Sequence, residues 1–124
     1  MRPELEALAA QETGEIQLTT GLTYGAEGPV VIRIRKQDQS YALDDEGAAV
    51  RQAGNPDGWT DVADGVVRTH GLAVDPDGVV SLADANERDL EALTLSVADT
   101  SLALYSALRN TDVEVGFDSD TSVE

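Results

Sequence analysis

Residues 30–54 read VVIRIRKQDQSYALDDEGAAVRQAG and contain the passage from sheet to helix on which the fold depends. Apolar and polar residues alternate over residues 30–36, which predicts a strand with one buried face. After the polar turn KQDQS, Tyr41 and Leu43 continue the sheet through residue 44. The apolar run that follows predicts a helix over residues 46–53, ended by Gly54. The stretch therefore predicts a hairpin followed directly by a helix.

Three consecutive carboxylates, Asp44, Asp45 and Glu46, stand where the strand gives way to the helix. The first backbone N–H groups of a helix lack partners, so an Asp side chain can accept from them and its negative charge is favoured there. Gly47 permits a tight bend at this point. Asp44, Asp45 and Gly47 are therefore predicted to form a structural turn and cap. A metal or catalytic site at Asp44 and Asp45 is the alternative, and it requires further ligands from elsewhere in the chain.

The same periodicities outside this stretch predict one α+β domain over residues 1–109. Its small, mainly antiparallel sheet is expected to have strands at about 15–20, 30–36, 40–44, 72–75 and 79–82. Helices at about 3–11, 46–53 and 59–69, and a long helix at 87–109, are expected to pack against it. Residues 110–124 are acidic and rich in Ser and Thr, which favours a flexible tail, although Val113, Val115 and Phe117 alternate as in an edge strand.

The long predicted helix carries more apolar surface than one contact with a sheet requires. A single stripe is expected to face the sheet; it consists of Leu90, Leu93, Val97, Leu104 and Leu108. Leu95 and Leu102 lie off that stripe, near Tyr105. Either the short helices cover this second side, or a partner or a twofold-related copy does. We predict that Leu95, Leu102 and Tyr105 contribute to such an interface.

Composition restricts the function classes. The 124 residues include 24 acids, eight bases and no cysteine, for a formal net charge of −16. Such a surface repels phosphate backbones, so direct nucleic-acid binding is not expected. Disulfides and thiolate chemistry are excluded, and no phosphate-binding loop, nucleophile motif or calcium loop predicts a cofactor. No apolar run has the length of a membrane span and no signal-peptide pattern is present, so a cytoplasmic protein is expected.

Three explanations of the acidity remain open: salt adaptation, binding of a basic protein partner, or charge that keeps the protein in solution. Arg33 and Arg35, followed by Lys36, gather three of the eight bases on one short stretch. They either pair with Glu15 and its neighbours across the sheet, or they form an anion-attracting spot on a surface that otherwise repels anions. On the second interpretation, Arg33 and Arg35 are predicted to belong to a partner interface.

Residues 15–108 resemble, in the order of their elements, an uncharacterised prokaryotic and phage domain family with a Tyr-x-Leu-x-Asp-x-Gly-like strand-to-helix turn. The most specific match is YALDDEG, residues 41–47. The resemblance implies a compact α+β domain in phage or mobile-element settings, with no established activity.

These observations predict a non-enzymatic acidic binding protein, an inhibitor or regulator that occupies a basic protein partner. A small metal-dependent hydrolase or nuclease using Asp44 and Asp45 is the alternative. A salt-adapted domain with a housekeeping role is the second alternative.

Overall fold

Two consecutive hairpins build most of the sheet. In the computed structural model, which describes residues 2–117 and the side chains of residues 2–110, three strands form an antiparallel meander. They are β1 (Thr13–Thr23), β2 (Pro29–Gln37) and β3 (Ser40–Asp44). Ile34 of β2 lies opposite Ile16 of β1 and Leu43 of β3, so the apolar faces of the three strands coincide. This register is what the alternation in the sequence requires, because a shift by one residue would turn every side chain to the other face.

A second hairpin completes the sheet on the far side of β3. It consists of β4 (Ala73–Val74) and β5 (Val80–Ala85), and β5 pairs with β3. The strand order is β1-β2-β3-β5-β4, and all four pairings are antiparallel. The predicted α+β fold, with five strands and a long C-terminal helix, is confirmed.

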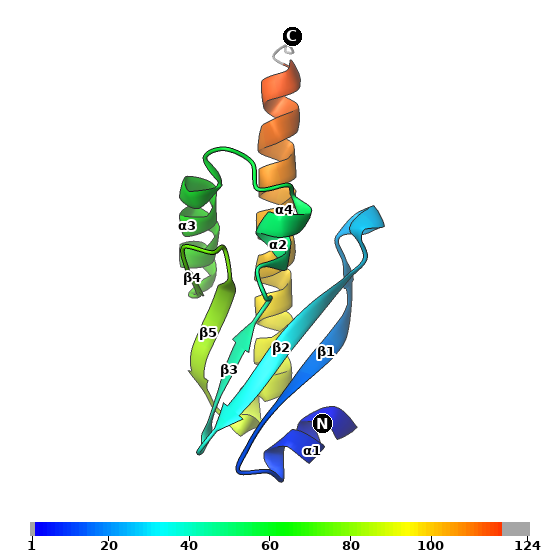
Figure 1. Ribbon diagram of the computed structural model, residues 1–124, viewed down its shortest axis with the longest axis vertical. Helices are drawn as coiled ribbons and strands as arrows, with labels where there is room; N and C mark the ends of the chain where they lie inside the picture. The colour runs from blue at the N-terminus through cyan, green and yellow to red at the C-terminus, as the bar shows by residue number, and fades with distance from the viewer. Residues whose placement is uncertain (1, 118–124) are drawn as a thin grey trace.

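The long helix α4 (Leu90–Phe117) lies along one face of the sheet (Figure 1). In that view the sheet lies in front of α4, and no described helix covers β2 or β3 on the viewer's side. Leu90, Val97, Leu104 and Leu108 are buried and Leu93 is half-buried, so the stripe predicted to face the sheet does so. The core is aliphatic with two buried tyrosines, Tyr24 and Tyr41.

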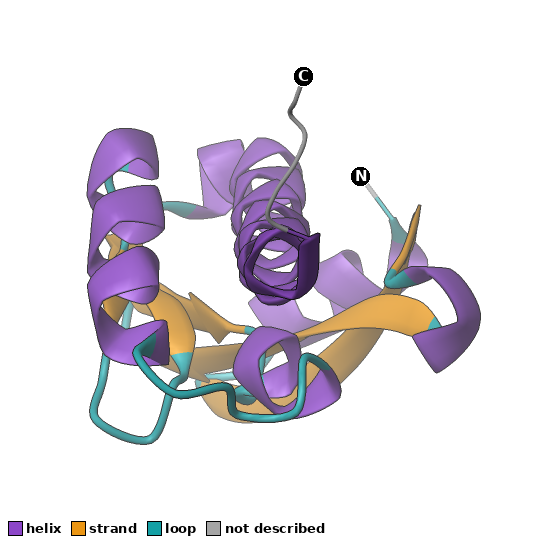
Figure 2. Cartoon of the chain, turned by 90° about the horizontal axis from the view of Figure 1, so that it is seen from above, coloured by secondary structure: helices purple, strands orange, loops and turns teal. Residues whose placement is uncertain are grey.

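Three shorter helices close the edges of this two-layer arrangement. In α1 (Pro3–Ala9), Leu5 and Leu8 are fully buried. α2 (Ala48–Gln52) follows the end of β3 and contacts α4, and α3 (Trp59–His70) packs beside α4 (Figure 2). None of the described helices combines the length and the apolar character needed to cross a bilayer.

Two helix ends lie two residues inside the approximate bounds that the sequence predicts. α2 begins at Ala48 instead of residue 46, because Glu46 and Gly47 both have positive φ values, 58° and 76°, which a right-handed helix does not contain. α1 ends at Ala9 instead of residue 11, where the Lys36 ammonium donates a hydrogen bond of 2.7 Å to the Ala9 carbonyl oxygen. A cation is favoured at this end of a helix.

The prediction for the C-terminal segment also needs correction. A 3-10 turn, η2 (Glu87–Asp89), precedes α4, and the helix runs past Arg109 to Phe117. The edge strand considered for residues 113–117 is therefore wrong, because residues 110–117 are helical. Each residue added to an existing helix gains one backbone hydrogen bond, whereas an edge strand must first find a partner edge. Residues 118–124 lie outside the described part of the chain.

Candidate functional site

Asp44 and Asp45 are adjacent in the chain but serve opposite faces of the sheet. Successive side chains of an extended chain alternate between faces. The Asp44 carboxylate lies on the face away from α4, beside Arg33, while the Asp45 carboxylate reaches Ser101 on α4. Both aspartates are 1% exposed. The two carboxylates that the sequence suggests as one site are therefore two separate groups.

Asp44 is held by two arginines and by its own turn. Its Oδ2 accepts hydrogen bonds from Nε and Nη2 of Arg33, at 3.1 and 3.0 Å, and lies 3.5 Å from Nη2 of Arg35. Its Oδ1 accepts the backbone N–H of Glu46 at 2.9 Å. The hydrogen bonding that Arg33 donates to Asp44 is the main cause that raises the pKa of Arg33 above its ordinary value. Charge-assisted contacts of this kind hold the Asp44 carboxylate in place.

Arg33 and Arg35 thus do not form a free anion-attracting spot. Glu15 is the cross-strand neighbour of Arg35, as expected. The ion pairs of the two arginines are made with other acids: both arginines pair with Asp44, and Arg33 also lies 3.8 Å from Glu46. Lys36 faces the other way: its Nζ donates to the Ala9 carbonyl and lies 5.7 Å from the centre of the Tyr41 ring. The three bases are close in sequence but lie on both faces of the sheet: Arg33 and Arg35 on one face, and Lys36 on the other.

Asp45 joins three elements through its two oxygens. Oδ1 accepts the backbone N–H groups of Gly47 at 2.8 Å and of Val80 at 3.0 Å, which connects the turn to β5. Oδ2 accepts the Ser101 hydroxyl at 2.6 Å and the N–H of Ala49, in the first turn of α2, at 3.4 Å. Asp45 thus accepts from the turn, from the first turn of α2, from β5 and from α4, while the N-cap residue of α2 itself is Gly47.

A tyrosine continues this network to the β1–β2 connection. The Tyr24 hydroxyl lies 2.7 Å from Ser101 Oγ, and burial raises the pKa of Tyr24 to about 12. Tyr24 is therefore protonated at neutral pH. Because the single hydroxyl proton of Ser101 is donated to Asp45, Tyr24 donates its own proton to Ser101. The result is a directed chain of hydrogen bonds, Tyr24 to Ser101 to Asp45, closed off from solvent.

Sequence reasoning missed Ser101 and Tyr24. A signal for Ser101 was present, because it falls on the buried stripe of α4 between Val97 and Leu104. A polar side chain at a core position requires a partner. Thr94, also buried on α4, meets this requirement within the helix, by donating to the carbonyl of Leu90 at 2.7 Å. Ser101 instead meets it with Asp45, a contact that spans 56 positions.

The network also makes stability depend on pH, with a sign that can be predicted. Burial is the largest influence on Asp45 and raises its pKa; the hydrogen bonds from Ser101 and the backbone oppose this only in part. The unfolded chain therefore loses its Asp45 proton first, near pH 4. The contribution of this group to folding is fully present below about pH 4 and is lost as pH rises through the folded-state pKa.

We expect the free energy of unfolding of the wild type to fall relative to that of Asp45→Asn as pH rises above about 4. Asn keeps an acceptor for Gly47 and Val80 but has no carboxyl group that titrates. All other acids are the same in the two proteins, so their contributions to the free energy of unfolding cancel in the difference. Urea denaturation of both proteins at several pH values measures this difference in the free energy of unfolding. A difference that grows in favour of the wild type with rising pH would contradict the raised pKa.

The chemical capacity of the junction follows from these contacts. Asp44 and Asp45 are each engaged by protein donors, and the part of the chain with described side chains contains no group of three or more His, Cys, Asp or Glu residues able to hold a metal ion. The arrangement positions β3, β5, α2 and α4 relative to one another. It is a structural junction.

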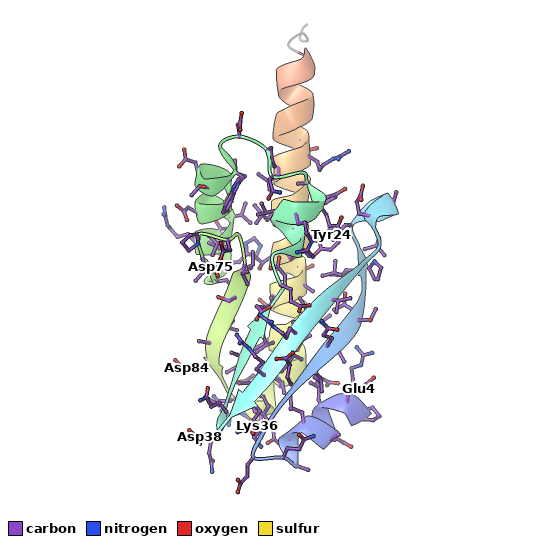
Figure 3. The ribbon with its side chains drawn as sticks, viewed as in Figure 1. Glu4, Tyr24, Lys36, Asp38, Asp75 and Asp84 are labelled. Carbon is purple, nitrogen blue, oxygen red and sulfur yellow. The ribbon has the colours of Figure 1, made fainter. Side chains whose placement is uncertain are left out.

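A second candidate site lies at the end of the sheet near the β2–β3 turn. A depression of about 580 Å³ is lined there by three exposed carboxylates, Glu12, Asp38 and Glu87, which we call the acidic depression. Glu12 comes from the connection between α1 and β1, Asp38 from the β2–β3 turn and Glu87 from η2. Figure 3 shows Asp38 and Lys36 at this end, with Asp84 nearby. The Tyr41 hydroxyl, at its inner wall, donates to Glu87 at 3.4 Å.

The residues predicted to form an interface differ in exposure. Leu95 is 55% exposed, and Leu102 and Tyr105 are half-buried. The ring of Tyr105 packs edge-on against Tyr24, with centroids 5.2 Å apart. Tyr105 thus already packs against a residue of its own chain, whereas Leu95 projects from α4 into solvent.

No family model, curated protein or solved structure matches this chain. The resemblance of the YALDDEG turn to a phage-associated domain family therefore remains a prediction from sequence.

Proposed function

We propose that this protein is a non-enzymatic binding protein whose acidic depression receives lysine and arginine side chains of a basic protein partner. One observation carries the proposal: Glu12, Asp38 and Glu87 converge on one depression from three separate segments. The arginines that could have offset the acidity, Arg33 and Arg35, are instead bound to Asp44 on the other face of the sheet.

The composition of the depression suits basic side chains. Carboxylates at a wet surface steer an oppositely charged partner and set its orientation. Lys36 also lines the depression, but its ammonium is held by the Ala9 carbonyl over the Tyr41 ring. The engagement of Asp44 and Asp45 by internal donors supports binding over hydrolysis, because a catalytic carboxylate must be available to substrate or metal. The role as an inhibitor or regulator in phage or mobile-element conflict rests on the resemblance of the strand-to-helix turn.

Neutralising the depression is expected to weaken binding of a basic peptide. The test compares two variants that each remove three negative charges: Glu12→Gln/Asp38→Asn/Glu87→Gln in the depression, and Glu4→Gln/Glu6→Gln/Asp64→Asn on exposed helix positions elsewhere. Asn suits position 38, whose φ is 57°. The probe is a fluorescently labelled decalysine peptide, and its anisotropy gives Kd at about 50 and 500 mM NaCl, where screening differs strongly.

We expect the depression variant to bind the peptide about tenfold more weakly than the wild type at low salt, from three exposed pairs of about 0.5 kcal/mol each. The control variant should stay within about twofold of the wild type, and high salt should abolish the difference. Equal weakening in both variants would show that only net charge matters and would refute the depression as the site. Calorimetric binding of Mg²⁺ or Mn²⁺ that is lost in Asp44→Asn would favour the hydrolase instead.

A further inference from the structure

The side of α4 that faces away from the sheet has the spacing of a helix–helix seam. Six positions follow one another at intervals of three and four: Ala92, Leu95, Asp99, Leu102, Ser106 and Arg109. Five of the six are exposed and Leu102 is half-buried. Alternating steps of three and four keep a stripe on one side of a helix over several turns, as in coiled coils. Figure 2 looks along α4 and shows this helix above the sheet layer.

This seam is unlike the rest of the protein surface. Over residues 90–110, where side chains are described, α4 carries three charged residues, Glu91, Asp99 and Arg109, although 26% of the chain is charged. Leu95, at 55% exposure, is the one large hydrophobic side chain classed as exposed among the described residues. A low-charge stripe with a projecting leucine, on a protein of net charge −16, is a surface suited to burial.

We propose that a second copy of the chain docks on this seam, with the two α4 helices antiparallel and Asp99 of each copy paired with the partner's Arg109. In an antiparallel pair, two positions lie opposite one another when their numbers have a constant sum. Setting 99 opposite 109 also sets Leu102 opposite the partner's Ser106. It sets Leu95 beside the backbone turn around position 113, which is helical. Every leucine of the seam then meets a small residue or a turn of helix, and both charges are paired.

Charge selects this register over the others. A parallel pair would set Asp99 against the partner's Asp99, and the two like charges would repel. Moving the antiparallel register by one heptad would set Asp99 against the partner's Leu102 and leave Arg109 against Ala92. In the proposed register, the two symmetric ion pairs flank the two copies of Leu102, and Leu95 lies outside them. The seam from Ala92 to Arg109 is about 27 Å long. A twofold axis generates each contact twice.

The proposal does not rest on the basic-partner function, and salt separates the two. Two copies with 24 acids and eight bases each repel one another, so added salt should favour the dimer. Binding of a basic partner by carboxylates should weaken with salt. The experiment uses the purified chain alone, so failure of one proposal is distinguishable from failure of the other.

Sedimentation equilibrium at about 100 µM protein and 500 mM NaCl, where the Debye length is short, tests the seam. We expect a mass near twice the 13.1 kDa of the chain for the wild type. Leu95→Glu should have the mass of one chain with an unchanged circular dichroism spectrum, because this side chain already projects into solvent. Ala7→Glu, which adds the same charge at an exposed position of α1, should remain a dimer.

A charge exchange tests the antiparallel register. Asp99→Arg alone and Arg109→Asp alone each set like charges opposite one another, and each should lower the dimer fraction. The double variant Asp99→Arg/Arg109→Asp restores opposite charges and should restore the dimer. A wild type with the mass of one chain at both low and high salt would overturn the proposal. A dimer that Leu95→Glu disrupts but the double exchange does not restore would overturn the register.

Discussion

Replacing Asp45 with Ala is expected to lower the free energy of unfolding by about 3–5 kcal/mol, because it leaves several buried donors without an acceptor. The backbone N–H groups of Gly47 and Val80 and the hydroxyl of Ser101 all donate to this carboxylate. Each buried donor left unpaired costs about 1–3 kcal/mol. Domains of this size have a total stability of about 5–15 kcal/mol. The variant should therefore be marginally folded, as urea or thermal denaturation will show.

The matched control is Asp75→Ala in the β4–β5 turn. Asp75 Oδ1 accepts the N–H groups of Asp77 and Val79, both at 2.9 Å, which is the same pattern of two backbone donors. Asp75 is exposed, so water can replace the lost acceptor and the expected cost is below about 1 kcal/mol. Equal losses in the two variants would show that burial of the Asp45 network contributes little, and would contradict the expectation.

Replacing Gly78 with Ala is expected to cost about 2–4 kcal/mol, from a strained backbone and a steric clash together. Gly78 has φ of 85°, and a Cβ atom there would lie 3.1 Å from both Cβ and Cγ2 of Val50. Val50 is 1% exposed in α2, and a β-branched side chain in a helix has few alternative rotamers. The clash can therefore be relieved only by moving α2 or the β4–β5 turn.

Gly54→Ala separates the two contributions. Gly54 has nearly the same φ, 87°, but no heavy atom lies within 4 Å of a Cβ built there. Gly54→Ala should therefore lower the free energy of unfolding through backbone strain alone, by about 1–2 kcal/mol. Thermal or urea denaturation of both variants gives the difference. If Gly78→Ala were no more destabilising than Gly54→Ala, a clash with Val50 would add nothing to the loss of stability, and this expectation would be contradicted.

Local periodicity was sufficient for the architecture. The alternation of residues 30–36, the polar turn and the apolar residues of β3 predict the central hairpin, and its observed register follows. The stripe of Val97, Leu104 and Leu108 likewise identifies the buried side of α4. These features repeat at the period of the backbone itself, so they can be read without knowing what lies across from them.

The partners of the polar groups were decided by the tertiary structure. The sequence places Asp44 and Asp45 side by side at the start of a helix, but only the tertiary structure sets Arg33 and Ser101 on opposite faces of the sheet and so separates their roles. Asp44 meets Arg33, and Asp45 meets Ser101, which is 56 positions away. The left-handed backbone at Glu46 likewise follows from the turn that these contacts impose. A buried polar group takes whichever donor the fold brings within about 3 Å, and that distance is not a property of any local pattern.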